Sequence, residues 1–373
     1  MAACTERWQA RAEPGSARLE PGRPVARDKR YLILAEGRAL DPHYGKTARG
    51  VILYGPDPVI ALVDSQAAGA EVEGVPVVAT VAEGLASEPP PTTALVGVAL
   101  AGGRLPPEWR SVLREVLEAG LDLETGMHEF LAEDGELAGL AERHGVEIRD
   151  LRKPPEDLSV PTGENLTHGA AVVLTVGSDC AIGKKTVAIE LDREARARGL
   201  GSVFVPTGQT GIAIAGWGIA VDAVVSDFLA GAAERLVVEG ARRGDILFVE
   251  GQGSIVHPQF SGVTLGLYHG SAPHVLLLCH KAGATEIEGV PGHRIPPLSD
   301  LVKLYEALAL PARPARVAAI ALNTAELNDE AARRAVAETS EATGLPADDP
   351  VRFGPGPLLE VILAAVPSGI TST

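Results

Sequence analysis

The hydrophobic residues in the second half of the chain fall into short, nearly continuous runs. Such runs, without polar alternation, are typical of strands buried on both faces of a parallel sheet. A helical pattern from Val187 to Arg198 follows the first of them. This half is therefore predicted to be an α/β domain, with strands over residues 171–176, 202–205, 245–250, 275–279 and 317–322.

The first half repeats this alternation with shorter runs. Its predicted strands are followed by a helix over residues 107–118, which carries apolar residues on one face. Strands alternating with helices favour a Rossmann-like parallel sheet. Asp64 ends the second strand, but no G-x-G-x-x-G turn precedes it, so a dinucleotide cofactor is not expected. The strands are predicted at residues 31–34, 59–64, 75–78 and 94–98.

Composition divides the chain into four segments. Residues 1–28 lack apolar periodicity and are predicted to be a flexible extension. Residues 29–151 form the Rossmann-like domain, and the proline-containing stretch 152–167 is predicted to link it to the next domain. Residues 168–373 then form an α/β domain like that of P-loop NTPases.

Charge and cysteine content restrict the possible partners. The formal charge is −16, and no basic stripe that could bind nucleic acid is visible outside the first thirty residues. No apolar stretch is long enough for a membrane span, and none near the start is typical of a secretory signal. Cys4, Cys180 and Cys279 follow no metal-ligand or disulfide spacing, which favours a reducing cytoplasm. We expect a soluble, cytoplasmic protein that acts on a small molecule and, from general frequency, forms homo-oligomers.

The strongest motif is a glycine-rich loop that follows the strand at residues 171–176. Glycine turns let backbone N–H groups converge on phosphate oxygens, and the next helix adds its positive dipole. The spacing departs from G-x-x-x-x-G-K-[ST], and it resembles the loop of dethiobiotin synthetase. Lys185 stands where a hydroxyl residue is usual, so Thr186 is the candidate hydroxyl. The predicted phosphate-binding residues are Gly177, Ser178, Asp179, Cys180, Gly183, Lys184, Lys185 and Thr186.

Further polar residues follow the other strands. Glu250, at the end of a strand, is the best candidate for a base or, beside phosphates, a Mg²⁺ ligand. His257 and Asp227 are further catalytic candidates, and Asp222 lies near the latter. Asn323 is placed to read a purine edge. The predicted substrate-binding residues, in turns after strands, are Thr207, Gln209, Thr210, Gln252 and Ser254.

Two weaker features have ordinary structural explanations. Cys180 lies at a helix N-terminus where a thiol can become nucleophilic, but a small space-filling residue is the favoured interpretation. The sequence Gly45-Lys46-Thr47 resembles a fragment of a phosphate loop, yet no strand directly precedes it. A surface turn is the favoured prediction there.

Several blocks together resemble one family, which has a Rossmann-like N-terminal domain and a P-loop C-terminal domain. The blocks are the phosphate loop, Thr207–Gly211, Ala215–Gly218, Val225–Phe228 and Val249–Ser254. The family was long of unknown function and includes D-glutamate N-acetyltransferase. The resemblance implies transfer of an acetyl group from acetyl-CoA to the amine of a small acidic amino acid such as glutamate, with the D configuration included. The phosphate loop would then hold CoA, and Glu250 or His257 would be the base. The first half is also similar to succinyl-CoA-synthetase-like domains, in which CoA lies across the strand ends.

Two alternatives remain open at this point. In an ATP-dependent ligase or kinase, Lys184, Thr186 and Glu250 would serve ATP and Mg²⁺ while a small carboxylic acid is phosphorylated. The second alternative is a regulator that binds a nucleotide without converting it. The sequence leaves the amine acceptor, its chirality, the oligomeric state and the choice of base undetermined.

Overall fold

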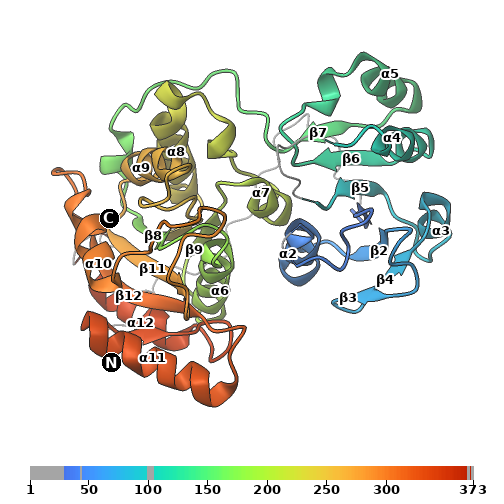
Figure 1. Cartoon of the computed structure of the whole chain (residues 1–373). Helices are drawn as coiled ribbons and strands as arrows, with labels where there is room; N and C mark the ends of the chain where they lie inside the picture. The colour runs from blue at the N-terminus through green and yellow to red at the C-terminus, as the bar shows by residue number, and fades with distance from the viewer. Residues whose placement is uncertain (1–28, 43, 99–104, 368–369, 371–373) are drawn as a thin grey trace. The chain divides into compact units, whose positions relative to one another are not determined.

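The computed structural model describes residues 29–42, 44–98, 105–367 and 370, and it consists of two compact units (Figure 1). The N-terminal unit contains the described residues up to Pro154 together with the segment Gln209–Ala223. The P-loop unit contains Pro155–Gly208 and the described residues from Val224 onward. The sequence had placed Gln209–Ala223 inside the second domain, and the extension predicted over residues 1–28 lies outside the described residues.

The N-terminal unit is built on a seven-stranded sheet with the order β3-β4-β2-β1-β5-β6-β7. Its strands run parallel except β3, which pairs antiparallel with β4. The strands are β1 (Tyr31–Leu34), β2 (Val59–Val63), β3 (Glu71–Val72), β4 (Val75–Val78), β5 (Thr93–Val96), β6 (Asp122–Thr125) and β7 (Ile148–Asp150). The helices of residues 29–154 are α2 (Lys46–Tyr54), α3 (Val81–Leu85), α4 (Trp109–Glu118) and α5 (Gly135–His144).

The elements of this unit agree in part with those predicted from the sequence. The four predicted strands and the helix after them are confirmed, with small shifts at their ends. Strands β3, β6 and β7 were not predicted. The surface turn predicted at Gly45-Lys46-Thr47 is wrong, because Lys46 begins α2. Thr47 and Val51 lie on the buried face of that helix, which explains why the segment is helical.

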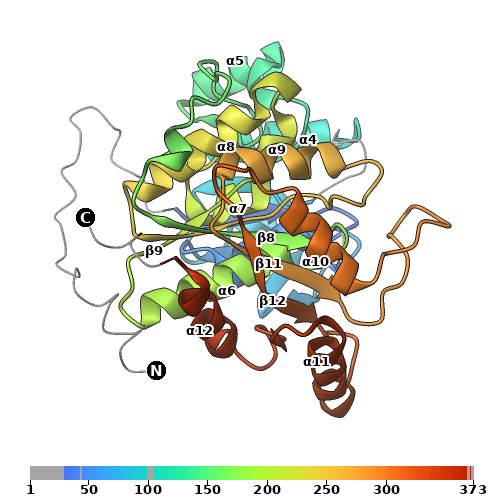
Figure 2. The ribbon, with the colours of Figure 1, turned by 90° about the vertical axis from the view of Figure 1, so that its left-hand side faces the viewer.

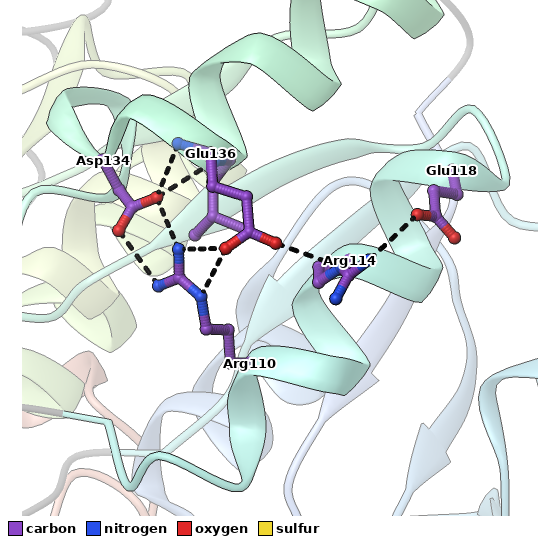
Figure 3. Close-up of polar contacts among 6 residues, drawn as sticks. Arg110, Arg114, Glu118, Asp134 and Glu136 are labelled. Carbon is purple, nitrogen blue, oxygen red and sulfur yellow. Dashed lines mark hydrogen bonds and ion pairs between the residues drawn. The ribbon is translucent and has the colours of Figure 1, made fainter.

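Helices α4 and α5 are joined by a cluster of ion pairs (Figure 3). The Asp134 carboxylate caps α5 by accepting the N–H groups of Glu136 and Leu137. Arg110 on α4 donates to Asp134 at 2.8 Å and also to Glu136. Arg114 pairs with Glu136 as well, at 3.2 Å. The cluster fixes the start of α5 against α4 with largely exposed charges, which usually contribute little stability.

The P-loop unit is built on a six-stranded sheet in which every paired strand runs parallel, with the order β13-β12-β11-β8-β10-β9. Helices α8 and α9 lie on one face of this sheet, and α6 and α12 lie on the other (Figure 2). The strands are β8 (Ala171–Gly177), β9 (Ser202–Val205), β10 (Ile246–Val249), β11 (Val275–Lys281), β12 (Arg316–Asn323) and β13 (Ala347–Asp348). The helices are α6 (Lys184–Ala197), α8 (Ser226–Ala241), α9 (Ser261–Ser271), α10 (Leu298–Ala307), α11 (Asp329–Thr343) and α12 (Gly356–Ala365).

The five apolar runs of the second half are therefore confirmed as strands, and β8 is buried along its whole length. The helix after β8 begins at Lys184, earlier than predicted. Within the predicted linker, Thr162 and Gly163 donate backbone N–H groups to the Glu234 carboxylate on α8. That part of the linker is thus fixed to the P-loop unit. Among the described residues, no helix combines the length and apolarity needed to cross a bilayer.

Candidate functional site

The phosphate loop lies between β8 and α6, at the carboxyl end of the central strands. Gly183 caps α6 with φ 111°, a conformation that favours glycine, and Ala181 also has a positive φ of 53°. A Cβ on Gly177 would lie 2.9 Å from the Ile182 side chain and 3.0 Å from the Asp179 carbonyl oxygen. The turn is therefore tight, and the first N–H groups of α6 lack intrahelical acceptors. Such a turn is suited to binding an anion.

Lys184 is the buried cation of this loop, with 5% of its surface exposed. Its ammonium donates to the Asp179 carbonyl oxygen at 2.7 Å. Burial lowers the pKa of Lys184, while the neighbouring thiols of Cys180 and Cys279 and the carboxylates of Asp179 and Glu250 oppose that shift. The loop thus places one lysine close to two acidic side chains.

Glu250 follows β10, the strand next to β8. Its Oε2 accepts the backbone N–H groups of Thr207 at 3.0 Å and Gly208 at 3.2 Å. These bonds hold a buried carboxylate, because only 5% of the surface of Glu250 is exposed. A Cβ at the next residue, Gly251, would lie 1.8 Å from the Thr175 carbonyl oxygen and 3.0 Å from Lys184 Cδ. Only a glycine allows this close approach, which brings the acid beside the lysine.

The carboxylate of Asp179 connects three parts of the site. Its Oδ1 accepts the N–H of Cys180 at 2.6 Å, and its Oδ2 accepts the N–H of Glu288 at 2.8 Å, from the segment after β11. The Nε2 atom of His257 lies 3.9 Å from Asp179 Oδ1. Gln259 donates its N–H to His257 Nδ1 at 3.2 Å, so the neutral ring carries its proton on Nε2. His257 therefore presents an N–H to Asp179.

Three side chains of this site are of types that can bind a metal ion. Asp179, Cys180 and His257 offer ligand atoms that lie within 4.8 Å of one another. A histidine nitrogen must be unprotonated to bind a metal, and the nitrogen nearest Asp179 is the one that carries the proton. The tautomer of His257 therefore does not fit a metal site built on these three residues.

Two residues that the sequence did not single out also hold the loop. The Tyr305 hydroxyl on α10 donates to the Gly177 carbonyl oxygen at 2.7 Å and accepts the Ile255 N–H at 3.1 Å. His280, at the end of β11, lies 2.8 Å from the Ser178 hydroxyl through Nδ1. Burial lowers the pKa of His280. The position of His280 beside the loop follows from the strand order, because β11 neighbours β8. No local sequence signal marks Tyr305.

The remaining candidates of the P-loop unit differ in their distance from the loop. Asn323 ends β12 and donates to the Ile182 carbonyl oxygen at 3.4 Å, so it lies at the loop. Gln252 donates to the Thr207 hydroxyl at 3.1 Å, close to Glu250, and Ser254 is fully buried. Asp227 lies exposed in the first turn of α8, and no contact among the described residues brings it to the loop. The residues in the first turn of α6, Lys185 and Thr186, are half-buried, as is Cys180.

Gln209 and Thr210 belong to the N-terminal unit, not to the P-loop unit. The turn predicted across them is wrong, because Gln209 begins the short helix α7 (Gln209–Ala215). Its side chain accepts a hydrogen bond from Arg152 at 2.8 Å, and the Thr210 hydroxyl lies 2.9 Å from that of Thr47. Arg152 also pairs with Asp222. These groups fasten the segment to its unit.

The corresponding acid of the N-terminal unit has both of its oxygens occupied. Asp64 follows β2 and is almost fully buried. Its Oδ2 accepts the Ala39 N–H at 2.9 Å, and its Oδ1 accepts the Gln66 N–H at 3.0 Å. Asp64 therefore caps its own turns.

Comparisons with known proteins give consistent matches to both units. Residues 159–359 match the model described as domain of unknown function (DUF1611_C) P-loop domain, and residues 63–154 match domain of unknown function (DUF1611_N) Rossmann-like domain. These matches confirm the predicted fold class. A solved structure of a DUF1611 family protein from Anabaena variabilis superposes with a TM-score of 0.84 at 40% identity, covering 91% of this chain and 99% of that one.

Two curated relatives carry the name D-glutamate N-acetyltransferase. The protein from Tritonibacter scottomollicae is 36% identical over 335 residues, which is 90% of this chain and 98% of the relative. The protein from a Pseudoalteromonas species is 34% identical over 264 residues, 70% of this chain and 78% of the relative. The similarity to the first relative spans both units.

Proposed function

The chain belongs to the DUF1611 family, and from this membership we propose that it is an N-acyltransferase that moves an acetyl group from acetyl-CoA to the amine of a small acidic amino acid, with D-glutamate as the first candidate. The similarity to the Tritonibacter relative, 36% identity across 90% of the chain, carries this proposal. The site supports it by placing a buried acid beside an anion-binding loop.

In this proposal Glu250 is the base. Its carboxylate takes a proton from the ammonium of the acceptor, and the resulting amine attacks the thioester carbonyl. The tetrahedral intermediate collapses and the C–S bond breaks, while the second proton that the attacking nitrogen must lose passes to the departing sulfur, so that CoA leaves as the thiol. Backbone N–H groups of the glycine-rich loops are the candidate donors for the intermediate oxyanion. The two N–H bonds to Oε2 orient the Glu250 carboxylate for this task.

His257 has a different part in this proposal. Its Nδ1 accepts from Gln259 and its Nε2 proton faces Asp179, so the ring has no lone pair left for an ammonium proton. At 3.9 Å its contact with Asp179 is longer than a hydrogen bond, and we assign His257 to the packing around that carboxylate. Of the two bases that the sequence suggests, this arrangement favours Glu250.

The test measures turnover with and without the requirements of phosphoryl transfer. Purified protein is incubated with acetyl-CoA and D-glutamate in EDTA, and N-acetylglutamate is quantified by mass spectrometry. We expect product without ATP or Mg²⁺, and no product with glutarate, which has no amine. L-Glutamate in a parallel reaction measures the preference for configuration. Consumption of ATP that depends on Mg²⁺ and the acidic substrate, with no use of acetyl-CoA, would replace the acyltransferase by a ligase or kinase.

A further inference from the structure

The buried charges around the phosphate loop are mixed in sign. Lys184 and the N–H groups at the start of α6 attract an anion. The carboxylates of Asp179 and Glu250 lie close enough to Lys184 to raise its pKa against the effect of burial. An ideal ligand for this site therefore carries a negative group and a positive group a short distance apart.

We propose that the loop binds the α-carboxylate of the amino-acid acceptor and that the nucleotide phosphates of the acyl donor bind outside it. This inference rests on the proposed acyl transfer and replaces the assignment of the loop to CoA that the sequence suggested. It makes Lys184 and the start of α6 the carboxylate site, and it makes Glu250 the neighbour of the ammonium group.

The distance between the anionic group and the reacting group in each substrate supports this choice. The carboxylate and the amine of an α-amino acid share one carbon, so their binding groups must be neighbours. Lys184 and Glu250 are suited to this condition, because the glycine after Glu250 approaches the aliphatic part of the Lys184 side chain and the Glu250 charge acts on the Lys184 ammonium. In acetyl-CoA, by contrast, the whole pantetheine arm separates the phosphates from the thioester. If the loop held those phosphates, Glu250 would lie beside them and far from the reacting carbon.

The net charge leads to the same assignment. A pyrophosphate or a 3′-phosphate would add at least one further negative charge next to two buried carboxylates, and P-loop enzymes that hold polyphosphates offset such charge with Mg²⁺. One of the N–H groups of the loop, that of Cys180, is already taken by the Asp179 carboxylate at 2.6 Å. A zwitterion places its carboxylate on the donors and its ammonium against the acids, so both charges are matched.

Cys180 offers a probe for occupation of the loop in the unaltered protein. Its thiol is half-buried within the loop, whereas Cys279 is fully buried and burial raises the pKa of Cys279 to about 12. Alkylation by iodoacetamide, followed peptide by peptide with mass spectrometry, should therefore report Cys180, with Cys279 as a slow internal reference. The two ligands compared are D-glutamate and adenosine 3′,5′-bisphosphate, which is the phosphate-bearing end of CoA without the arm.

We expect D-glutamate at ten times its dissociation constant to slow alkylation of Cys180 about tenfold, because about a tenth of the sites then stay free. The bisphosphate, at the same multiple of its own constant, should leave the rate unchanged. Protection by the bisphosphate, alone or together with D-glutamate, would overturn the assignment, and so would absence of protection by either ligand when calorimetry shows that both bind. If calorimetry shows binding of neither D-glutamate nor acetyl-CoA, the proposed function itself fails.

Discussion

In each unit of this protein a central strand is followed by a connecting turn and then by a helix that begins at a lysine directly after a glycine. In the P-loop unit, β8 leads to α6, which begins at Lys184 after Gly183. In the N-terminal unit, β1 leads to α2, which begins at Lys46 after Gly45. Gly183 has a left-handed φ of 111°, and Lys184 after it is buried against Asp179. Gly45, by contrast, has a φ of −82°, which is not left-handed. The two turns share their position in the fold but differ in their capacity to bind an anion.

The acids beside these turns differ in the same way. Asp64 accepts one backbone N–H on each of its oxygens, so it closes its own loops. Glu250 receives both backbone bonds on Oε2. A buried acid at the end of a parallel strand is thus not by itself a sign of chemistry. What distinguishes Glu250 is its location beside a buried lysine and a loop with helix N–H groups.

The largest expected effect comes from replacing the lysine of one turn and comparing it with the same replacement in the other turn. Lys184→Met removes the charge that binds the acceptor while keeping the apolar stem. We expect a loss of at least about 100-fold in kcat/KM for D-glutamate, with KM for acetyl-CoA little changed. The matched variant Lys46→Met should keep kcat/KM within about twofold. Equal losses in both variants would remove the distinction between the turns, and circular dichroism checks that both fold.

Glycine replacements test the close packing under the two turns. Gly251→Ala puts a Cβ 1.8 Å from a backbone carbonyl, and Gly97→Ala puts one 2.2 Å from the Ile33 side chain. We expect each to lower the free energy of unfolding by about 1–3 kcal/mol or more in urea titrations, and only Gly251→Ala to abolish acyl transfer as well. Gly262→Ala on α9, with open space around its Cβ, is the control and should not destabilise the protein. A fully active Gly251→Ala protein would contradict the packing described for Glu250.

Acid should destabilise the P-loop unit more than the N-terminal unit above pH 3.8, because burial lowers the pKa of several histidines in the P-loop unit and that of His128 in the N-terminal unit. Burial lowers the pKa of His274 from 6.5 to about 3 and also lowers that of His168, both near the start of β8. The unfolded chain takes up these protons below pH 6.5 and the folded P-loop unit does not, so its stability falls as the pH drops from 6.5 towards 3, by roughly 1–2 kcal/mol at pH 5. In the N-terminal unit, Arg110 and backbone N–H groups hold the pKa of Asp134 at about 2. Its contribution is present above pH 3.8 and disappears only as the pH falls towards 2.

Hydrogen exchange measured from pH 7 to pH 4 can separate these responses. We expect protection in β8 and β10 to decline first, while α4 and α5 keep theirs until lower pH. The variant His168→Leu, which removes a ring whose two nitrogens are buried without partners, should reduce the decline in the P-loop unit. A simultaneous loss of protection in α5 would contradict the assignment to these histidines.

The smallest expected effect concerns the exposed ion pairs of α4 and α5 (Figure 3). Arg110→Gln removes the pairs with Asp134 and Glu136 but leaves the Asp134 cap in place. We expect a loss below about 1 kcal/mol that shrinks further in high salt, because exposed pairs are screened. Acetyl transfer should be unchanged. A larger loss that is insensitive to salt would show that the cluster supports the packing of the N-terminal unit more than its exposure implies.

The parts predicted correctly from sequence are those with a continuous local signal. Buried parallel strands such as β8 and β11 read as unbroken apolar runs, and the glycine-rich loop is a contiguous motif. Strands β6 and β7 were not predicted from the sequence, because they carry charged residues. In β6, Glu124 is buried with partners from distant positions, including Tyr31 at 2.7 Å.

The parts that were missed depend on contacts between distant residues. Helix α7 is held by Arg152 and Thr47, neither of which is near it in sequence. The Tyr305 hydroxyl reaches the phosphate loop from α10. The backbone N–H of Glu288 binds Asp179 whatever its own side chain is. None of these contacts leaves a pattern that spacing alone can reveal.

The most direct test of the central claim compares the two buried acids. N-acetyl-D-glutamate formed from acetyl-CoA is measured for Glu250→Gln and Asp64→Asn, two substitutions of nearly equal shape. We expect Glu250→Gln to fold normally and to lose at least about 100-fold in rate. Asp64→Asn should keep its rate while losing about 1–3 kcal/mol of stability. A Glu250→Gln protein that forms product at the wild-type rate would contradict the account, because the acid beside the phosphate loop would then not be the base.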